Sequence, residues 1–250
     1  MPGHMSAIGF PVTSATDFTN LAVQATRSAK QNFSISGVGS YRLWSPGSGV
    51  ELWPQLDQDN KLMGLHPHFS GRARMQVQLE KRVVHPRDTP LDGAFYAWAN
   101  PHGGTTTNGD YPFCFDSPDY RVHDNLKLPL EASVQLAAFP DLLYAYDDEK
   151  QMRSSGHWTK DMAPESCIPS GTFHPKSGVI DPPNPDIMFC GTVRETSKLT
   201  NPATGQQFYC ALVRTLGGEL DVVADSTIII GTIKAGGIVG ARSWMSGRLK

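Results

Sequence analysis

The sequence predicts a mainly β fold with one helix near its start. Runs in which apolar and polar residues alternate recur along the chain, and a period of two is typical of half-buried strands. The 24 glycines and 19 prolines are scattered between these runs, which is typical of short strands joined by tight turns. A chain of 250 residues is long enough for one large domain or two of ordinary size, and for a core without disulfides or metals.

The first elements follow from local signals. Residues 1–5, MPGHM, are typical of a cloning remnant because a second Met follows Gly-His, so we expect the natural chain to start near Met5. Apolar residues at helical spacing predict a helix over residues 16–30. Residues 33–44 are expected to form one strand that bends at Gly37.

The middle of the chain alternates clear strands with loops. The strongest period-two run covers 73–84 and returns over 93–99, and further strands are expected at 112–116 and 130–139, with 142–146 as an extension of the sheet. Six prolines make 154–185 a connecting arm, because proline density of this kind excludes helix and central strand. The predicted organisation is therefore an N-terminal β region with one helix (6–153), the arm (154–185) and a C-terminal part (186–250).

The C-terminal part has the pattern of a small, curved antiparallel sheet. A strand with Gly191 at its bend is followed by the turn 201–205, a second strand, the pair Gly217-Gly218 and a returning strand. This order resembles the five-stranded oligonucleotide- or oligosaccharide-binding (OB) barrel, and the resemblance implies an OB-like barrel over 186–250. Residues 65–71 and 173–178 share a His-Pro and a Ser-Gly step, so a duplicated barrel and a chance match both stay open.

Composition narrows the class of function. The net charge of −2, from 22 basic and 24 acidic residues, argues against a nucleic-acid binder that works by bulk charge, and a local basic patch stays open. The four cysteines lack CxxC spacing, so we expect no metal site from them, and we expect no cofactor. The chain lacks both an apolar leader and an apolar run of membrane length. We therefore expect a cytoplasmic protein with free thiols and no membrane contact.

Three histidines are candidate site residues. His66 and His68 would lie on one face of a strand, which suits metal binding or acid–base chemistry, although Pro67 disfavours a regular strand. His102 lies in the polar loop 100–110, which is long enough to be a functional loop. The alternative is that these are ordinary surface or hydrogen-bonded histidines.

Two basic and aromatic sets are the other candidates. Arg72 and Arg74 lie near Trp98 of the returning strand, and basic groups beside aromatic rings suit single-stranded nucleic acid. The second set alternates along the last strand and consists of Arg242, Trp244 and Arg248. The alternative for both is a solvated face on which arginine stems cover apolar surface.

Three functional hypotheses follow. The first is a non-enzymatic binding or interaction protein, with single-stranded nucleic acid or another protein as the partner. The second is an enzyme with a pocket between the two β regions, covered by the loop 100–110, in which His66, His68 or His102 titrates. The third is a structural component that assembles as a homo-oligomer through strand edges and aromatic patches. The sequence identifies no ligand.

Overall fold

The computed structural model describes residues 2–103, 108–159, 161–174 and 176–250, and it confirms the predicted mainly β class. The helices are α1 (Pro2–Ser6), α2 (Ala15–Ser28) and α3 (Glu149–Ser154), with short 3-10 turns η1 (Tyr120–His123) and η2 (Ser226–Ile228). The strands are β1 (Gln31–Ile35), β2 (Gly39–Gly47), β3 (Val50–Asp57), β4 (Leu62–Phe69), β5 (Met75–Val83), β6 (Ala94–Ala99), β7 (Tyr111–Asp116), β8 (Leu130–Tyr146), β9 (Ser166–Ile168), β10 (Phe173–His174), β11 (Gly178–Val179), β12 (Asp186–Thr200), β13 (Gln207–Thr215), β14 (Gly218–Ala224), β15 (Ile229–Ile230) and β16 (Ile238–Leu249).

Strands β1 to β4 form an antiparallel meander, called sheet A below. The single bent strand expected over 33–44 is two paired strands, because Gly37 has a positive φ of 71° in the turn between β1 and β2. Pro67 lies inside β4, although the sequence disfavoured a regular strand there. β4 is an edge strand, and its outer row of N–H groups has no partner strand among the described residues, so a proline can be accommodated.

The larger sheet closes on itself and is called the ring sheet below. Its strands follow the order β13-β14-β8-β5-β6-β7-β16-β12, and β12 pairs again with β13. β12 pairs with β16 as far as Thr192 and with β13 from there on. A Cβ at Gly191 would lie 2.4 Å from Val213 Cγ1, so this change of partner needs a residue without a side chain.

The expected OB-like barrel over 186–250 is not confirmed. Strands β12, β13, β14 and β16 lie where the sequence predicted strands, with Gly217 and Gly218 at positive φ between β13 and β14. Their ring is completed by β8, which pairs in parallel with β14 and in antiparallel fashion with β16. β8 precedes the proline-rich arm, so the ring sheet takes strands from both sides of it. The duplication of a barrel stays a prediction.

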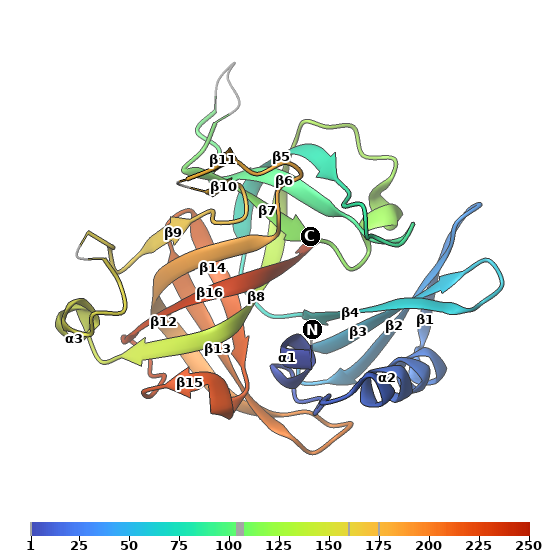
Figure 1. The fold of residues 1–250 in the computed structure, drawn as a ribbon, viewed down its shortest axis with the longest axis horizontal. Helices are drawn as coiled ribbons and strands as arrows, with labels where there is room; N and C mark the ends of the chain where they lie inside the picture. The colour runs from blue at the N-terminus through green and yellow to red at the C-terminus, as the bar shows by residue number, and fades with distance from the viewer. Residues whose placement is uncertain (1, 104–107, 160, 175) are drawn as a thin grey trace.

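The two largest apolar clusters of the described residues hold these layers together. One fills the ring sheet, with Phe95, Phe113 and Phe189 among its fully buried rings. The second lies between sheet A, the segment after α1, and the outer face of the ring sheet, where Phe10 and Phe139 are buried. Figure 1 shows the ring sheet and sheet A side by side, with α1 between them and α2 along sheet A. Among the described residues, no helix combines the length and the apolar character needed to cross a membrane.

Candidate functional site

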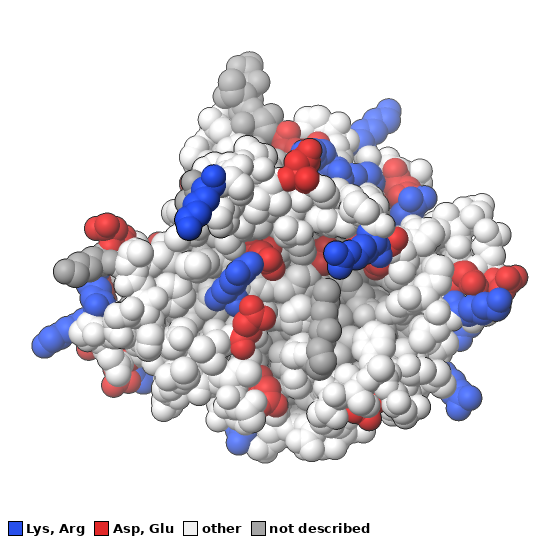
Figure 2. All heavy atoms as spheres, in the orientation of Figure 1, with Lys and Arg blue, Asp and Glu red and all other residues white. Residues whose placement is uncertain are grey.

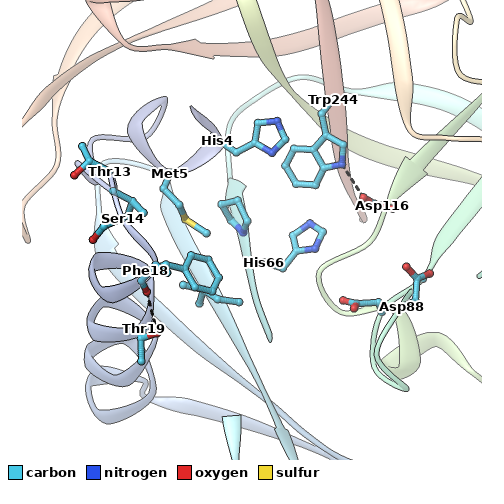
Figure 3. Close-up of a pocket in the computed structure, with 16 residues that line it drawn as sticks. His4, Met5, Thr13, Ser14, Phe18, Thr19, His66, Asp88, Asp116 and Trp244 are labelled. Carbon is cyan, nitrogen blue, oxygen red and sulfur yellow. Dashed lines mark hydrogen bonds between the residues drawn. The ribbon is translucent and has the colours of Figure 1, made fainter. Parts of the chain in front are cut away.

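A cavity of about 610 Å³ lies where sheet A meets the ring sheet. Its walls come from α1, the start of α2, strand β4, the segment between β5 and β6, the end of β7 and the middle of β16 (Figure 3). The apolar part of the lining is Met5, Val12, Phe18, Leu65, Pro67 and Trp244, and the titratable part is His4, His66, Asp88, Asp92 and Asp116.

Local sequence signals fix where α2, which forms one wall of the cavity, begins. Ser14 caps the helix by accepting from the Asp17 N–H, and the Asp17 carboxylate accepts from the Ser14 N–H at 2.9 Å. Asp17 also accepts from the Thr13 hydroxyl, and the Thr19 hydroxyl donates to the carbonyl of Ala15. The predicted helix is therefore present, and the hydroxyl groups of Thr13 and Thr19 at the cavity are already used as donors.

Asp116, at the end of β7, is the most perturbed carboxyl group of the cavity. It is partly buried, and Oδ2 accepts a hydrogen bond from Trp244 Nε1 at 2.6 Å. Burial raises its pKa to about 7, against the effect of the indole N–H, and the nearby carboxylates of Asp88 and Asp92 raise it further. Asp116 therefore changes its charge near neutral pH.

His66 and His68 project from the same face of β4, as the H-x-H spacing predicts. His66 Nε2 lies 3.2 Å from Ser246 Oγ of β16, and His68 Nδ1 lies 2.8 Å from the same oxygen. His68 is fully buried, whereas His66 is partly exposed to the cavity. Burial lowers the pKa of His66 to about 4 and that of His68 to about 3, so both rings are neutral at pH 7.

A chain of buried polar groups continues behind His68. His68 Nε2 lies 2.8 Å from Gln135 Oε1 of β8, and Gln135 Nε2 donates to the carbonyl of Phe69 and to Asp221 Oδ2. The Asp221 carboxyl also accepts from the backbone N–H groups of residues 72 and 73. The chain thus links β4, β8, β14 and β16 across the interface of the two sheets.

Arg248 closes the interface two residues beyond Ser246. Its guanidinium contacts both oxygens of Glu51, at 3.3 and 3.4 Å, and donates to Asp119 Oδ2 at 3.0 Å. It also lies over the ring of Trp53, 4.6 Å from the centroid, and the Trp53 indole donates to Glu51. The Arg248 guanidinium therefore pairs with two carboxyl groups and packs on one ring, and these contacts connect β16 to sheet A.

The fold brings together only some of the predicted site residues. His66 and Trp244 line the cavity, with ring centroids 5.0 Å apart, while His68 and Arg248 lie behind it. His102 is exposed and pairs with Asp110, away from the cavity lining, and part of its loop lies outside the described residues.

The remaining basic and aromatic candidates lie elsewhere on the surface. Arg72 forms an exposed ion pair with Glu195, and Arg242 forms one with Asp186. Arg74 is exposed and donates to a neighbouring carbonyl, and Trp98 is half-buried on β6. On the face in Figure 2, basic and acidic side chains are interspersed rather than gathered into one basic patch.

Sequence reasoning missed Asp116, Gln135 and Ser246. Asp116 follows an aromatic strand and could have been noticed as a carboxylate at a strand end, but nothing local marks Gln135 or Ser246. Among the described residues, no group of three or more His, Cys, Asp or Glu side chains is arranged to hold a metal ion.

His4 and Met5 belong to the segment that the sequence assigns to a cloning remnant. The His4 ring stacks on Trp244 at a centroid distance of 4.5 Å, and Met5 is buried. His4 and Trp244 also line a second cavity of about 470 Å³, so the two stacked rings lie between the two cavities.

Comparisons of the chain with known protein families, with curated proteins and with solved structures find no match.

Proposed function

We propose that the protein is an enzyme that binds a small organic substrate in the 610 Å³ cavity and exchanges a proton with it through Asp116. This develops the second hypothesis of the sequence analysis, a pocket between two β regions that contains a histidine. The observation that carries the proposal is a carboxyl group with a pKa of about 7 in the wall of a cavity that combines apolar side chains with polar ones.

The size and lining of the cavity support a small molecule as the occupant. Pockets for such ligands generally have volumes of about 300–1,000 Å³, with apolar walls and a few placed polar groups. Here the polar groups at the centre are Asp116 and His66, which both contact the indole of Trp244. A general acid or base is most effective when its pKa lies near the working pH, and Asp116 meets that condition.

The nucleic-acid hypothesis has less support from the geometry. Arg72, Arg242 and Arg248 each pair with carboxylates, so their charge is largely compensated by the protein itself. The basic groups and Trp98 do not lie around one concave site. Binding of single-stranded nucleic acid therefore stays a prediction from the sequence. The contacts of these arginines favour it less than the cavity favours a small-molecule ligand.

The experiment is a screen of small organic molecules against the 15N-labelled protein, followed by mass spectrometry of the hits for conversion. Cavity ligands are expected to shift the Trp244 indole N–H signal, because that group donates to Asp116. Asp116→Asn should abolish conversion while the protein stays folded, whereas Glu195→Gln at the exposed ion pair should not change it. If no molecule shifts the signal, or if Asp116→Asn converts substrate as fast as the original chain, the proposal is wrong.

A further inference from the structure

The direction of each hydrogen bond behind the cavity can be assigned, starting from Gln135. Its Nε2 donates to the Phe69 carbonyl at 3.0 Å, which can only accept, so the orientation of the amide is fixed. Gln135 Oε1 therefore faces His68, and His68 Nε2 must carry the proton of that 2.8 Å hydrogen bond. His68 is neutral at pH 7, so its Nδ1 is an acceptor.

The same argument continues through Ser246 to the cavity. The Ser246 hydroxyl has a single hydrogen, and it donates that hydrogen to His68 Nδ1 at 2.8 Å. Ser246 Oγ is then the acceptor for His66, so His66 Nε2 carries the ring proton. His66 is also neutral, so its Nδ1 carries a lone pair and can accept a hydrogen bond. Within the described residues no group donates to Nδ1, and His66 lines the cavity.

The carboxyl groups at the cavity are also acceptors, and the described lining holds in addition the His4 ring and three hydroxyl groups. Asp92 accepts from the Thr89 N–H and from Gln55, and Asp88 accepts from the His85 N–H. Asp116 accepts from Trp244 and has no described partner at Oδ1. Lys and Arg are absent from the described lining, so an anionic ligand would meet three carboxyl groups without a counter-charge.

We propose that the cavity recognises a protonated organic amine, whose N–H groups donate to His66 Nδ1 and to the Asp116 carboxylate. This deepens the proposed function by naming its substrate class, and it rests on that function. The geometry is suitable because His66 and Asp116 flank the same Trp244 indole. A neutral His66 does not repel the cation, and the carboxylates attract it. His68, Gln135 and Ser246 are positioning residues that hold His66 in the accepting tautomer.

The experiment compares three probes of similar shape and different charge: benzylammonium, benzyl alcohol and benzoate. Binding is followed through the Trp244 indole N–H signal at pH 8. We expect benzylammonium to bind at least tenfold more tightly than benzyl alcohol and benzoate not to bind, by the charge argument above. Equal or tighter binding of either other probe, or no binding of benzylammonium, overturns the inference.

The pH dependence tests the role of Asp116. Benzylammonium keeps its proton between pH 6 and pH 8, so a change in affinity reports on the protein. With an Asp116 pKa of about 7, the ionised fraction rises about tenfold over this range, and the affinity should rise with it. Asp116→Asn should remove the pH dependence and weaken binding at pH 8 by at least tenfold, and Glu195→Gln should change neither. An unchanged pH dependence in Asp116→Asn contradicts the inference.

The tautomer is tested directly by 15N NMR of the imidazole rings. We expect the Nε2–H form for both His66 and His68 at pH 7, and a change in the His66 Nδ1 shift when benzylammonium binds. Ser246→Ala should leave His68 with the Nε2–H form, which Gln135 fixes, and should allow His66 to populate both tautomers. A His66 ring that carries its proton on Nδ1, or that is cationic at pH 7, overturns the inference.

The two proposals can fail separately. If benzyl alcohol binds as tightly as benzylammonium, the substrate class is wrong, while proton exchange at Asp116 is still judged by conversion of screened molecules. If benzylammonium binds as expected and no screened molecule is converted, recognition of amines holds and the enzyme proposal fails.

Discussion

The interface between β4 and β16 has two ends, and the buried carboxyl groups at the two ends have different partners. At the cavity end, Asp116 accepts a hydrogen bond from the indole of Trp244. At the other end, called the sealed end here, Glu51 accepts one from the indole of Trp53 and also contacts Arg248. The difference is the guanidinium, because each carboxyl group has one tryptophan donor and only the sealed end has a cation.

The same contrast separates two aspartates that lie three residues apart. Burial would raise the pKa of Asp119, but the His123 ring at 3.5 Å and the Arg248 guanidinium outweigh it and hold that pKa well below its usual range. Asp116 has burial without a cation, and its pKa rises to about 7. A buried carboxyl group beside a cation of the protein stabilises the fold as an anion, whereas one without such a neighbour can change its charge near neutral pH.

The largest expected effect is at the sealed end. Arg248→Met should lower the free energy of unfolding at pH 7 by about 3–5 kcal/mol, because it leaves Glu51 and Asp119 buried without a cation. Arg242→Met is the matched control on the same strand, and its exposed ion pair should be worth less than about 1 kcal/mol. Urea unfolding measures both. Equal losses in the two variants would contradict the special role of Arg248.

The second largest effect on stability is expected at the cavity end, where a substitution should raise the free energy of unfolding instead of lowering it. A carboxyl group whose pKa is higher in the folded state than in the unfolded state binds more protons when folded, so stability falls as the pH rises from about 4 to 7. Asp116→Asn should therefore stabilise the protein at pH 8, by up to about 4 kcal/mol for a shift of this size, and by nothing below about pH 4.

Asp119→Asn is the comparison for that variant. It removes an anion that is stabilised by a cation, so it should destabilise the protein at pH 8, and this effect should persist down to about pH 4 and fade only at lower pH. Thermal unfolding from about pH 2 to pH 8 measures both variants. If the two curves shift in the same direction at pH 8, the contrast between the two ends is wrong.

A smaller effect is expected between the two ends, at Ser246. Ser246→Ala leaves the buried His68 Nδ1 without its donor, which should cost about 1–3 kcal/mol. His68→Gln is a harsher comparison, because it also removes the partner of Gln135 Oε1. If Ser246→Ala is as stable as the original chain in urea unfolding, the hydroxyl does not bridge the two rings.

The smallest effects are expected on the exposed basic residues outside the interface. Arg72→Gln should change stability by less than about 1 kcal/mol, because its ion pair with Glu195 is exposed. We also expect little affinity for single-stranded oligonucleotides at low salt, since the paired arginines form no continuous basic face. Tight binding that weakens steeply with added salt, and that Arg72→Gln reduces, would revive the nucleic-acid hypothesis.

The sequence by itself determined the β class, a helix near the start of the chain (expected over 16–30, present over Ala15–Ser28), the hairpin at Gly217-Gly218 and the shared face of His66 and His68. These features depend on contacts between residues close in sequence, where propensity and period are informative. The sequence also singled out His66 and Trp244, and the fold places both at the cavity.

Only the tertiary structure decided how the strands close and which polar groups meet. β8 joins the C-terminal strands, which the OB-like prediction did not include, and β4 packs across β16 so that Ser246 reaches two histidines. Pairing between strands far apart in the chain leaves no local pattern, because the period of a strand reports its two faces and not its neighbours. The pKa of Asp116 follows from the same long-range packing, since burial and missing cations, not the residue type, raise it.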